Sequence, residues 1–236
     1  IIIRNGYAVQ SFGYERYLPL GTPEALVENL ARWKVDEIVV TDIGCTKENY
    51  VINYELISKL AHISDGTPLI YSGGISSPLD AAKVIENGAD RIVIENSFYT
   101  RKVTPKEIAL EIGAQAIIMS IPVINKSKNL YFFDYLQRKS IELSEIQFLL
   151  NDDFISEFLI TDVANEGAID KSFQANLISN KFFKNLSLIC NGGINSLDSC
   201  QNLLKTNLVK AIMIGNKLNH SELSYLQIKD NLPTKI

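Results

Sequence analysis

Two short glycine-containing segments have the residue types of a phosphate-binding turn. Residues 72–75 read Ser-Gly-Gly-Ile and residues 191–194 read Asn-Gly-Gly-Ile, each after an apolar run and before a helical pattern. Paired glycines let backbone N–H groups approach an anion closely, and a following helix adds a favourable dipole. The alternative is that both pairs are only tight turns. With the adjacent loops at 95–97 and 215–216, the predicted phosphate-binding residues are Ser72, Gly73, Gly74, Asn96, Ser97, Asn191, Gly192, Gly193, Gly215 and Asn216.

Two aspartates end matching apolar segments and are candidates for acid–base chemistry. Residues 37–42 read Glu-Ile-Val-Val-Thr-Asp, and residues 157–162 read Glu-Phe-Leu-Ile-Thr-Asp, so that Asp42 and Asp162 are 162 − 42 = 120 residues apart. Two carboxylates that face one cavity can have separated pKa values and divide the acid and base roles. For Asp42, the alternative is a hydrogen bond to backbone amides that anchors a loop.

These candidate residues belong to an internal repeat of about half the chain. Residues 91–96 (Arg-Ile-Val-Ile-Glu-Asn) recur at 211–216 (Ala-Ile-Met-Ile-Gly-Asn), again 120 positions later in a chain of 236 residues. Three matched segments in one order indicate two copies of one unit of strands and helices. We therefore predict an α/β fold, a (β/α)8 TIM barrel of two homologous half-barrels, about 1–112 and 113–236.

The apolar runs and helix signals supply the elements that such a barrel needs. Near-continuous Val, Ile and Leu content is typical of parallel strands covered on both faces. Helices are predicted at Pro23–Lys34, Leu79–Asn87, Pro105–Ile112 and Leu197–Leu204. The first and third follow a threonine N-cap and begin with proline, the second and third end at a C-cap glycine, and the fourth mirrors the second. Residues 125–153 predict an insertion that carries an extra hairpin over one rim, with a strand at Leu130–Tyr135 and a helix at Leu143–Leu150. The predicted barrel strands are Ile1–Ile3 with Tyr7–Gln10, Glu37–Ile43, Pro68–Tyr71, Arg91–Ile94, Ala116–Ile121, Glu157–Val163, Leu186–Cys190 and Ala211–Ile214.

Composition narrows the class of protein. With 46% hydrophobic and 21% charged residues, the chain fits one large globular domain. A net charge of −4 without a basic run argues against a nucleic-acid partner. The longest apolar run, Ala116–Ile124, is shorter than the roughly 18 residues of a membrane helix, so no membrane span is expected. Three scattered cysteines favour a reducing, cytoplasmic compartment. Two separated histidines predict no metal site, and we expect no cofactor.

The glycine turns, the segment 36–43 and the segment 88–91 (Gly-Ala-Asp-Arg) resemble the histidine-biosynthesis barrels over essentially the whole chain. The resemblance is stronger to the cyclase (HisF-like) subunit of imidazole glycerol phosphate synthase than to the phosphoribosylformimino isomerase. It implies a HisH-like glutaminase at the bottom face, whose ammonia crosses the barrel to a phosphorylated substrate at the top. The charged ring at that entrance is matched by Glu37, Arg91 and Glu157, although a purely structural salt-bridge ring is the alternative.

The residues that carry chemistry depart from this family. Aligned on Asn5-Gly6 and on segment 113–115, its two catalytic aspartates fall on Ile2 and Pro122, neither of which can transfer a proton. The lysine of its first loop falls on Gln10, and the acidic residue after its sixth strand falls on Glu166. The remaining catalytic candidates are Asp42, Asp162 and Glu166.

Three functions fit this combination. The first is an ammonia-using synthase subunit of the cyclase type. The second is a diverged paralogue that aminates or amidates another sugar phosphate or sugar nucleotide, for example in surface polysaccharide synthesis. The third is a non-catalytic phosphate-binding barrel that activates a glutaminase.

Overall fold

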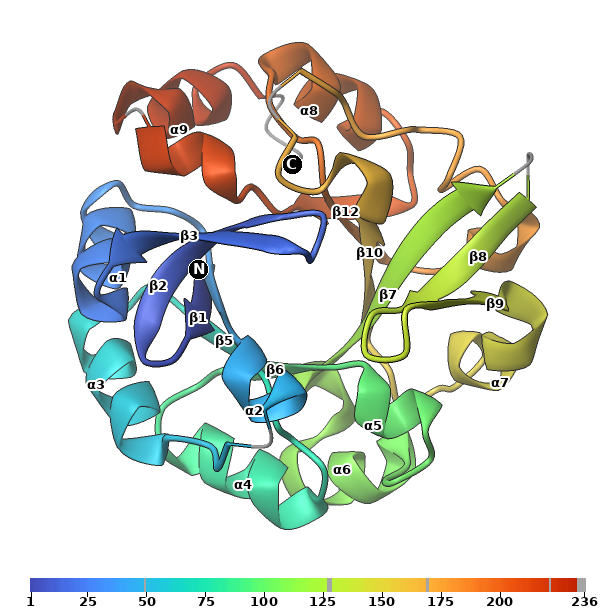
Figure 1. Ribbon diagram of the computed structural model, residues 1–236, viewed down its shortest axis with the longest axis horizontal. Coiled ribbons are helices and arrows are strands. Elements are labelled where there is room, and N and C mark those ends of the chain that lie inside the picture. The colour runs from blue at the N-terminus through green and yellow to red at the C-terminus, as the bar shows by residue number, and fades with distance from the viewer. Residues whose placement is uncertain (49, 127–128, 169, 221, 233–236) are drawn as a thin grey trace. The chain divides into compact units, whose positions relative to one another are not determined.

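The computed structural model describes residues 1–48, 50–126, 129–168, 170–220 and 222–232, and the chain divides into two compact units (Figure 1). Residues 127 and 128 of the predicted insertion lie outside the described residues. Unit 1 consists of Ile1–Gln10, Leu18–Met119 and Asp152–Ser156, and unit 2 consists of Ser11–Tyr17, Ser120–Asn151 and Glu157–Ile236.

The sheet of unit 1 is parallel except at its N-terminal hairpin. Strand β1 pairs in parallel with β4 and antiparallel with β2, and the order continues from β4 through β5 and β6 to the start of β7. Strands β5 and β6 are buried over three of their four residues, as parallel strands covered on both faces require. The bounds are β1 (Ile2–Arg4), β2 (Tyr7–Phe12), β3 (Arg16–Gly21), β4 (Ile38–Asp42), β5 (Leu69–Ser72), β6 (Arg91–Ile94) and β7 (Ile117–Lys126).

Helices α1 and α6 begin at Pro23 and Pro105, as predicted, and α4 begins at Pro78, one residue before its predicted start. Thr22, Ser77 and Thr104 each accept a hydrogen bond from the first turn of the helix that follows, and a proline occupies the next position in all three. Helix α1 packs against α3, and α4 packs against α6. The bounds are α1 (Pro23–Arg32), α2 (Ile43–Lys47), α3 (Tyr54–Ile63), α4 (Pro78–Glu86), α5 (Asn96–Tyr99), α6 (Pro105–Ile112) and the 3-10 turn η1 (Ala114–Ala116).

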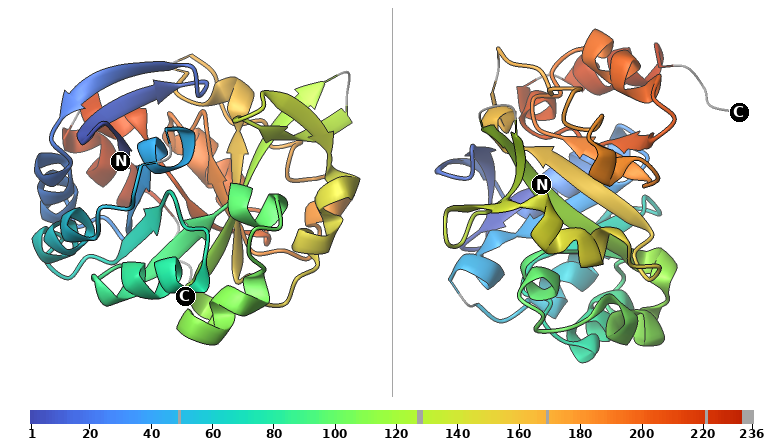
Figure 2. Two further views of the ribbon diagram at one scale, coloured as in Figure 1. Left: turned by 60° about the horizontal axis from the view of Figure 1, so that its bottom comes forward. Right: turned by 90° about the vertical axis from the view of Figure 1, so that its right-hand side faces the viewer.

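Unit 2 contains a second parallel set of strands and an antiparallel extension. Strand β10 (Glu157–Asp162) pairs in parallel with β11 (Leu188–Asn191), which pairs in parallel with β12 (Val209–Ile212). The far end of β7 pairs antiparallel with β8 (Asn129–Asp134), and β8 with β9 (Lys139–Glu142) (Figure 2). The remaining elements are η2 (Leu143–Ile146), α7 (Gln147–Leu150), η3 (Val163–Asn165), η4 (Lys181–Phe183), α8 (Leu197–Leu204), η5 (Asn216–His220) and α9 (Glu222–Lys229).

Some local predictions differ from the structure. The helix predicted at Leu143–Leu150 is a 3-10 turn followed by one short α-helix, η2 and α7. Strand β3 was not expected. It exposes four of its six residues, so it does not show the hydrophobic pattern by which a buried strand is recognised.

Candidate functional site

The glycine turn of unit 1 follows β5 and packs directly against the end of β4. Gly73 and Gly74 have φ angles of +130° and +71°. A Cβ atom on Gly73 would lie 2.2 Å from the backbone oxygen of Asp42, and one on Gly74 would lie 2.8 Å from Cβ of Cys45. The Gly74 amide donates to Oγ1 of Thr46 at 3.3 Å. Only glycine fits both positions, because backbone conformation and space exclude a side chain.

The glycine turn of unit 2 repeats this arrangement after β11. Gly192 and Gly193 have φ angles of +92° and +74°. A Cβ on Gly192 would lie 2.5 Å from the backbone oxygen of Asp162, and one on Gly193 would lie 2.8 Å from the amide nitrogen of Phe173. In both units, therefore, the turn is packed on the main chain of the aspartate that ends the preceding strand.

The strand register of the two units extends the correspondence. Thr41 of β4 lies opposite Ser72 of β5, and Thr161 of β10 lies opposite Asn191 of β11. In unit 2, the Asn191 side chain also donates to Oγ1 of Thr161 at 3.3 Å. Each aspartate is therefore one residue beyond the last position that pairs with the following strand, although Asp42 still pairs with Ile3 of β1. Both lie at the carboxyl end of their strands, where enzymes of the barrel class place their chemistry.

Asp42 uses its carboxylate to begin helix α2. Its Oδ1 accepts a hydrogen bond from the Gly44 amide at 3.0 Å, which makes Asp42 the N-cap of the helix. Burial raises the pKa of this carboxyl, and the bond from Gly44 partly offsets that rise. The side chain is only half-buried. The anchoring bond and this partial exposure leave Asp42 a candidate for both structural and chemical roles.

Asp162 is 1% exposed and holds the loop that follows β10. Its Oδ2 accepts hydrogen bonds from Nδ2 of Asn165 at 2.7 Å and from the Gln174 amide at 3.0 Å. Burial raises the pKa of Asp162, and the bond from Gln174 is the largest opposing effect. In this arrangement the carboxylate anchors the loop.

We expect Asp162→Ala to lower the free energy of unfolding by about 2–4 kcal/mol, because the donors on Asn165 and Gln174 lose their acceptor. Asp162→Asn retains one oxygen and should cost about 1 kcal/mol. Burial raises the pKa of Asp162 in the folded protein, because it disfavours the charged carboxylate relative to the protonated carboxyl. The advantage of wild type over Asp162→Asn should therefore be largest below the usual aspartate pKa of 3.8 and should narrow as pH rises from there through the folded pKa.

Urea unfolding followed by circular dichroism at several pH values measures these differences. Asp153→Ala, at an exposed position, is the matched control and should unfold with the wild type. An Asp162→Ala variant as stable as Asp153→Ala would contradict the anchoring role.

Glu166 binds the tip of the N-terminal hairpin, which belongs to unit 2. Its Oε2 accepts from Oγ of Ser11 at 3.2 Å and from the Tyr14 amide at 3.3 Å. The next residue, Gly167, leaves no room for a side chain, since its Cβ would lie 2.2 Å from the backbone oxygen of Ser11. Asn216 donates to that same oxygen at 2.7 Å. Two predicted site residues, Glu166 and Asn216, therefore both bind Ser11 of the hairpin. The sequence did not predict these contacts.

The other predicted phosphate-binding residues lie in loops next to the turns. Ser97, in the short helix α5, donates through Oγ to the backbone oxygen of Ile75 at 2.6 Å, which ties the loop after β6 to the glycine turn of unit 1. Asn96 begins α5, whose N-cap Glu95 makes no side-chain capping bond. Gly215 does not have a positive φ, and a Cβ atom added to it would have no heavy atom within 4 Å.

The three charged residues predicted for an entrance stand at the opposite, amino ends of the strands. Glu37 directly precedes β4, while Arg91 and Glu157 are the first residues of β6 and β10. Arg91 donates through Nη2 to Oγ of Ser156 at 3.1 Å, and Ser156 donates to the backbone oxygen of Ile117 at 2.7 Å. Ser156 immediately precedes Glu157 in the chain.

The positions of the absent aspartates are apolar. Ile2 lies opposite Thr41 near the carboxyl end of β4. Pro122 is buried in β7, between the residues that pair with β6 and those that pair with β8. Proline has no N–H to donate and is tolerated where no ladder bond is required. Neither residue supplies a group that can transfer a proton.

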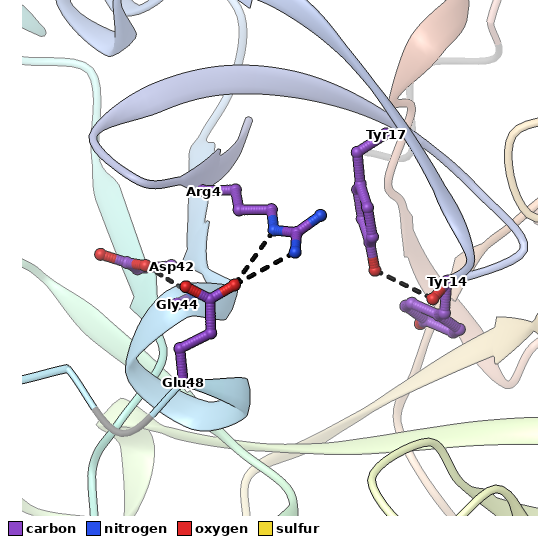
Figure 3. A network of polar contacts seen from close by, with 6 residues as sticks. All are labelled: Arg4, Tyr14, Tyr17, Asp42, Gly44 and Glu48. Atoms are coloured by element: carbon purple, nitrogen blue, oxygen red, sulfur yellow. Dashed lines mark hydrogen bonds and ion pairs between the residues drawn. The ribbon is translucent and has the colours of Figure 1, made fainter.

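An ion pair beside Asp42 was also missed from the sequence. Nε and Nη2 of Arg4 both donate to Oε1 of Glu48, at 3.2 and 3.1 Å (Figure 3). The side chains are 41% and 27% exposed, so the pair contributes little to stability. Its partners are 44 residues apart, and nothing local in the sequence indicates the contact.

In the parts of the chain that the structure describes, no cluster of three or more His, Cys, Asp or Glu side chains could hold a metal ion. Likewise, no described helix combines the length and apolar character needed to cross a bilayer.

Known proteins resemble the chain over nearly its whole length. The model of the family described as "Histidine biosynthesis protein" matches residues 1–224. A putative imidazole glycerol phosphate synthase subunit hisF2 of Vibrio vulnificus is 25% identical over 97% of this chain and 85% of its own length. The HisF subunit of that synthase from Clostridium beijerinckii is 23% identical over 99% of this chain and 93% of its own. The HisF subunit from Sulfolobus acidocaldarius is 25% identical over 86% of this chain and 82% of its own length.

Repeated parallel strands and helices, with glycine turns at equivalent strand ends, define a duplicated α/β protein of the barrel class. The chain belongs to the histidine biosynthesis protein family, and within it the chain is HisF-like. The predicted fold class, a (β/α)8 barrel, is confirmed at the level of this family.

Proposed function

We propose that the chain is a HisF-like synthase subunit that uses ammonia from a HisH-like glutaminase on a phosphorylated, sugar-type substrate. The observation that carries this proposal is the match to synthase subunits over 97% and 99% of the chain. The glycine turns at equivalent strand ends support a phosphorylated ligand, since such turns present backbone N–H groups to anions. Asp42, Asp162 and Glu166 remain the proposed source of acid–base chemistry.

Ammonia would enter at the amino ends of the strands, past Glu37, Arg91 and Glu157. Glu37 directly precedes β4, and Arg91 and Glu157 begin β6 and β10, so each lies at the end of its strand opposite to the end that the glycine turn of its unit contacts. A charged ring there can serve both as an entrance and as a docking surface for the glutaminase.

The diverged paralogue is the second candidate, and Ile2 and Pro122 favour it. A chain that retains the turns but has no proton-transferring group at these positions fits amination or amidation of another sugar phosphate or sugar nucleotide. Surface polysaccharide synthesis is one pathway of this kind. The third candidate, a non-catalytic phosphate-binding barrel that activates a glutaminase, predicts no turnover with any acceptor.

The glutaminase partner can be tested directly. The purified chain should form a complex with a HisH-like glutaminase and raise its glutamine turnover at least about tenfold. Glu157→Ala should remove most of that stimulation, because it deletes a charge at the proposed entrance. Turnover is measured by glutamate release, and complex formation by size-exclusion chromatography.

Glu145→Ala, which removes an exposed glutamate of the same unit, is the matched control and should keep full stimulation. The absence of a complex, or equal stimulation by wild type and Glu157→Ala, would overturn the proposed entrance and partner.

A further inference from the structure

The two units differ in charge at the loop beside their glycine turns. After β6 the chain reads Glu95-Asn96-Ser97, and 120 residues later it reads Gly215-Asn216-Lys217. The loop of unit 1 therefore carries one negative charge, and its counterpart in unit 2 carries one positive charge. Asparagine is common to both. A carboxylate repels a phosphate that an ammonium group attracts, so this comparison of the two loops favours unit 2 as the anion site. Unit 2 also contains the Glu166 carboxylate, which accepts hydrogen bonds from Ser11 and Tyr14.

Gly215 has a property that the turn glycines lack. Gly73, Gly74, Gly192 and Gly193 are required by positive φ angles and by atoms less than 3 Å from a Cβ position. Gly215 has neither constraint, because the space around its Cβ position is open to 4 Å. Nothing within the protein thus requires glycine there. A glycine of this kind exposes main chain to close approach by another molecule.

In unit 1, side chains of the protein itself bind the glycine turn and its neighbouring loop, and the residues 120 positions later in unit 2 are of different types. Thr46 accepts the Gly74 amide, whereas the residue 120 positions later, Glu166, binds the hairpin residues Ser11 and Tyr14. Ser97 ties the unit 1 loop to Ile75, whereas the residue 120 positions later is Lys217. The Gly74 amide and the Ser97 hydroxyl are therefore already bonded within unit 1. In unit 2 the Asn216 side chain is likewise bonded, to the backbone oxygen of Ser11, so the anion contacts proposed there are main-chain N–H groups and Lys217.

We infer that phosphate binds in unit 2, at Gly192-Gly193 and Gly215-Asn216, and that the turn of unit 1 is structural. The substrate accordingly presents one phosphate group, and its other end is not held as a phosphate. This inference rests on the proposed function and narrows its substrate to singly phosphorylated sugars and related compounds.

Isothermal titration with inorganic phosphate tests the number and place of the sites. One phosphate should bind per chain. Gly215→Glu, which recreates the unit 1 residue, should raise the dissociation constant at least about tenfold. Lys217→Gln is the second variant, and it should weaken binding about threefold or more. Glu86→Gln, which removes an exposed carboxylate of unit 1 at the far end of α4, is the matched control and should leave phosphate affinity unchanged.

A pair of organic probes tests the substrate class. Ribulose 1,5-bisphosphate should bind less than about threefold more tightly than ribose 5-phosphate, since only one phosphate is held. Two phosphates per chain, a tenfold gain for the bisphosphate, or unchanged binding by both Gly215→Glu and Lys217→Gln would overturn the inference. Failure to bind any phosphate would also overturn it. None of these binding results bears on glutaminase stimulation, which is measured separately. Failure of this inference is therefore distinguishable from failure of the proposed function.

Discussion

Replacing Gly73 with alanine should destabilise the folded protein by about 4 kcal/mol or more, a large part of the total stability of a typical domain. At φ +130°, an L-residue is strained before any contact is considered. The new Cβ would also lie 2.2 Å from the backbone oxygen of Asp42, far inside contact distance. Relief requires the turn after β5 to separate from the end of β4, which displaces Asp42.

Urea unfolding of Gly73→Ala beside Gly215→Ala measures this cost. The Gly215 variant places the same methyl group in open space at an ordinary φ, so its midpoint should remain within a few tenths molar of the wild type. Equal midpoints for the two variants would show that the close approach of β5 to β4 is not a feature of the folded protein.

The second large effect is expected in the histidine-pathway reaction. The chain should fail to restore growth of a cyclase-deficient histidine auxotroph, because Ile2 and Pro122 cannot transfer protons. A positioned acid or base contributes roughly 10²–10⁴-fold to such a rate, and both groups are absent here. The purified complex should convert the pathway substrate with ammonia at least about 10²-fold more slowly than a HisF subunit that restores growth.

That active HisF subunit, expressed from the same vector, is the positive control for growth and for the assay. Growth at a rate equal to the control would show that other residues supply the acid and base, with Asp42 and Asp162 as the first to substitute. Turnover of a different sugar phosphate, without histidine-pathway activity, would instead support the diverged paralogue.

The sequence predicted the repeated elements well because their signals are local. Runs such as Ile38–Asp42 and Glu157–Asp162 are recognisable by composition, and caps such as Thr104 mark helix starts. The glycine turns were predicted in place, and their strain and close packing on the preceding strand explain why both residues are glycine. Whether they bind phosphate stays a prediction.

Contacts between distant segments were beyond sequence reasoning. Glu166 was predicted as a catalytic candidate, yet its carboxylate accepts from Ser11, 155 residues away. Asp162 was predicted for chemistry, yet its partners are Asn165 and a Gln174 amide presented by an irregular loop. No periodicity specifies such contacts, because they depend on how loops fold over strand ends.

The close packing of Gly73 concerns the main-chain oxygen of Asp42, and Gly192 has the same relation to Asp162. A carbonyl oxygen is present whichever amino acid occupies those positions. Evolution can therefore exchange the side chains at the strand ends while the glycines stay fixed. In such a scaffold, selection on folding preserves the turns even after selection on a particular reaction has ceased. Descendants of one enzyme can then acquire new substrates without rebuilding the framework.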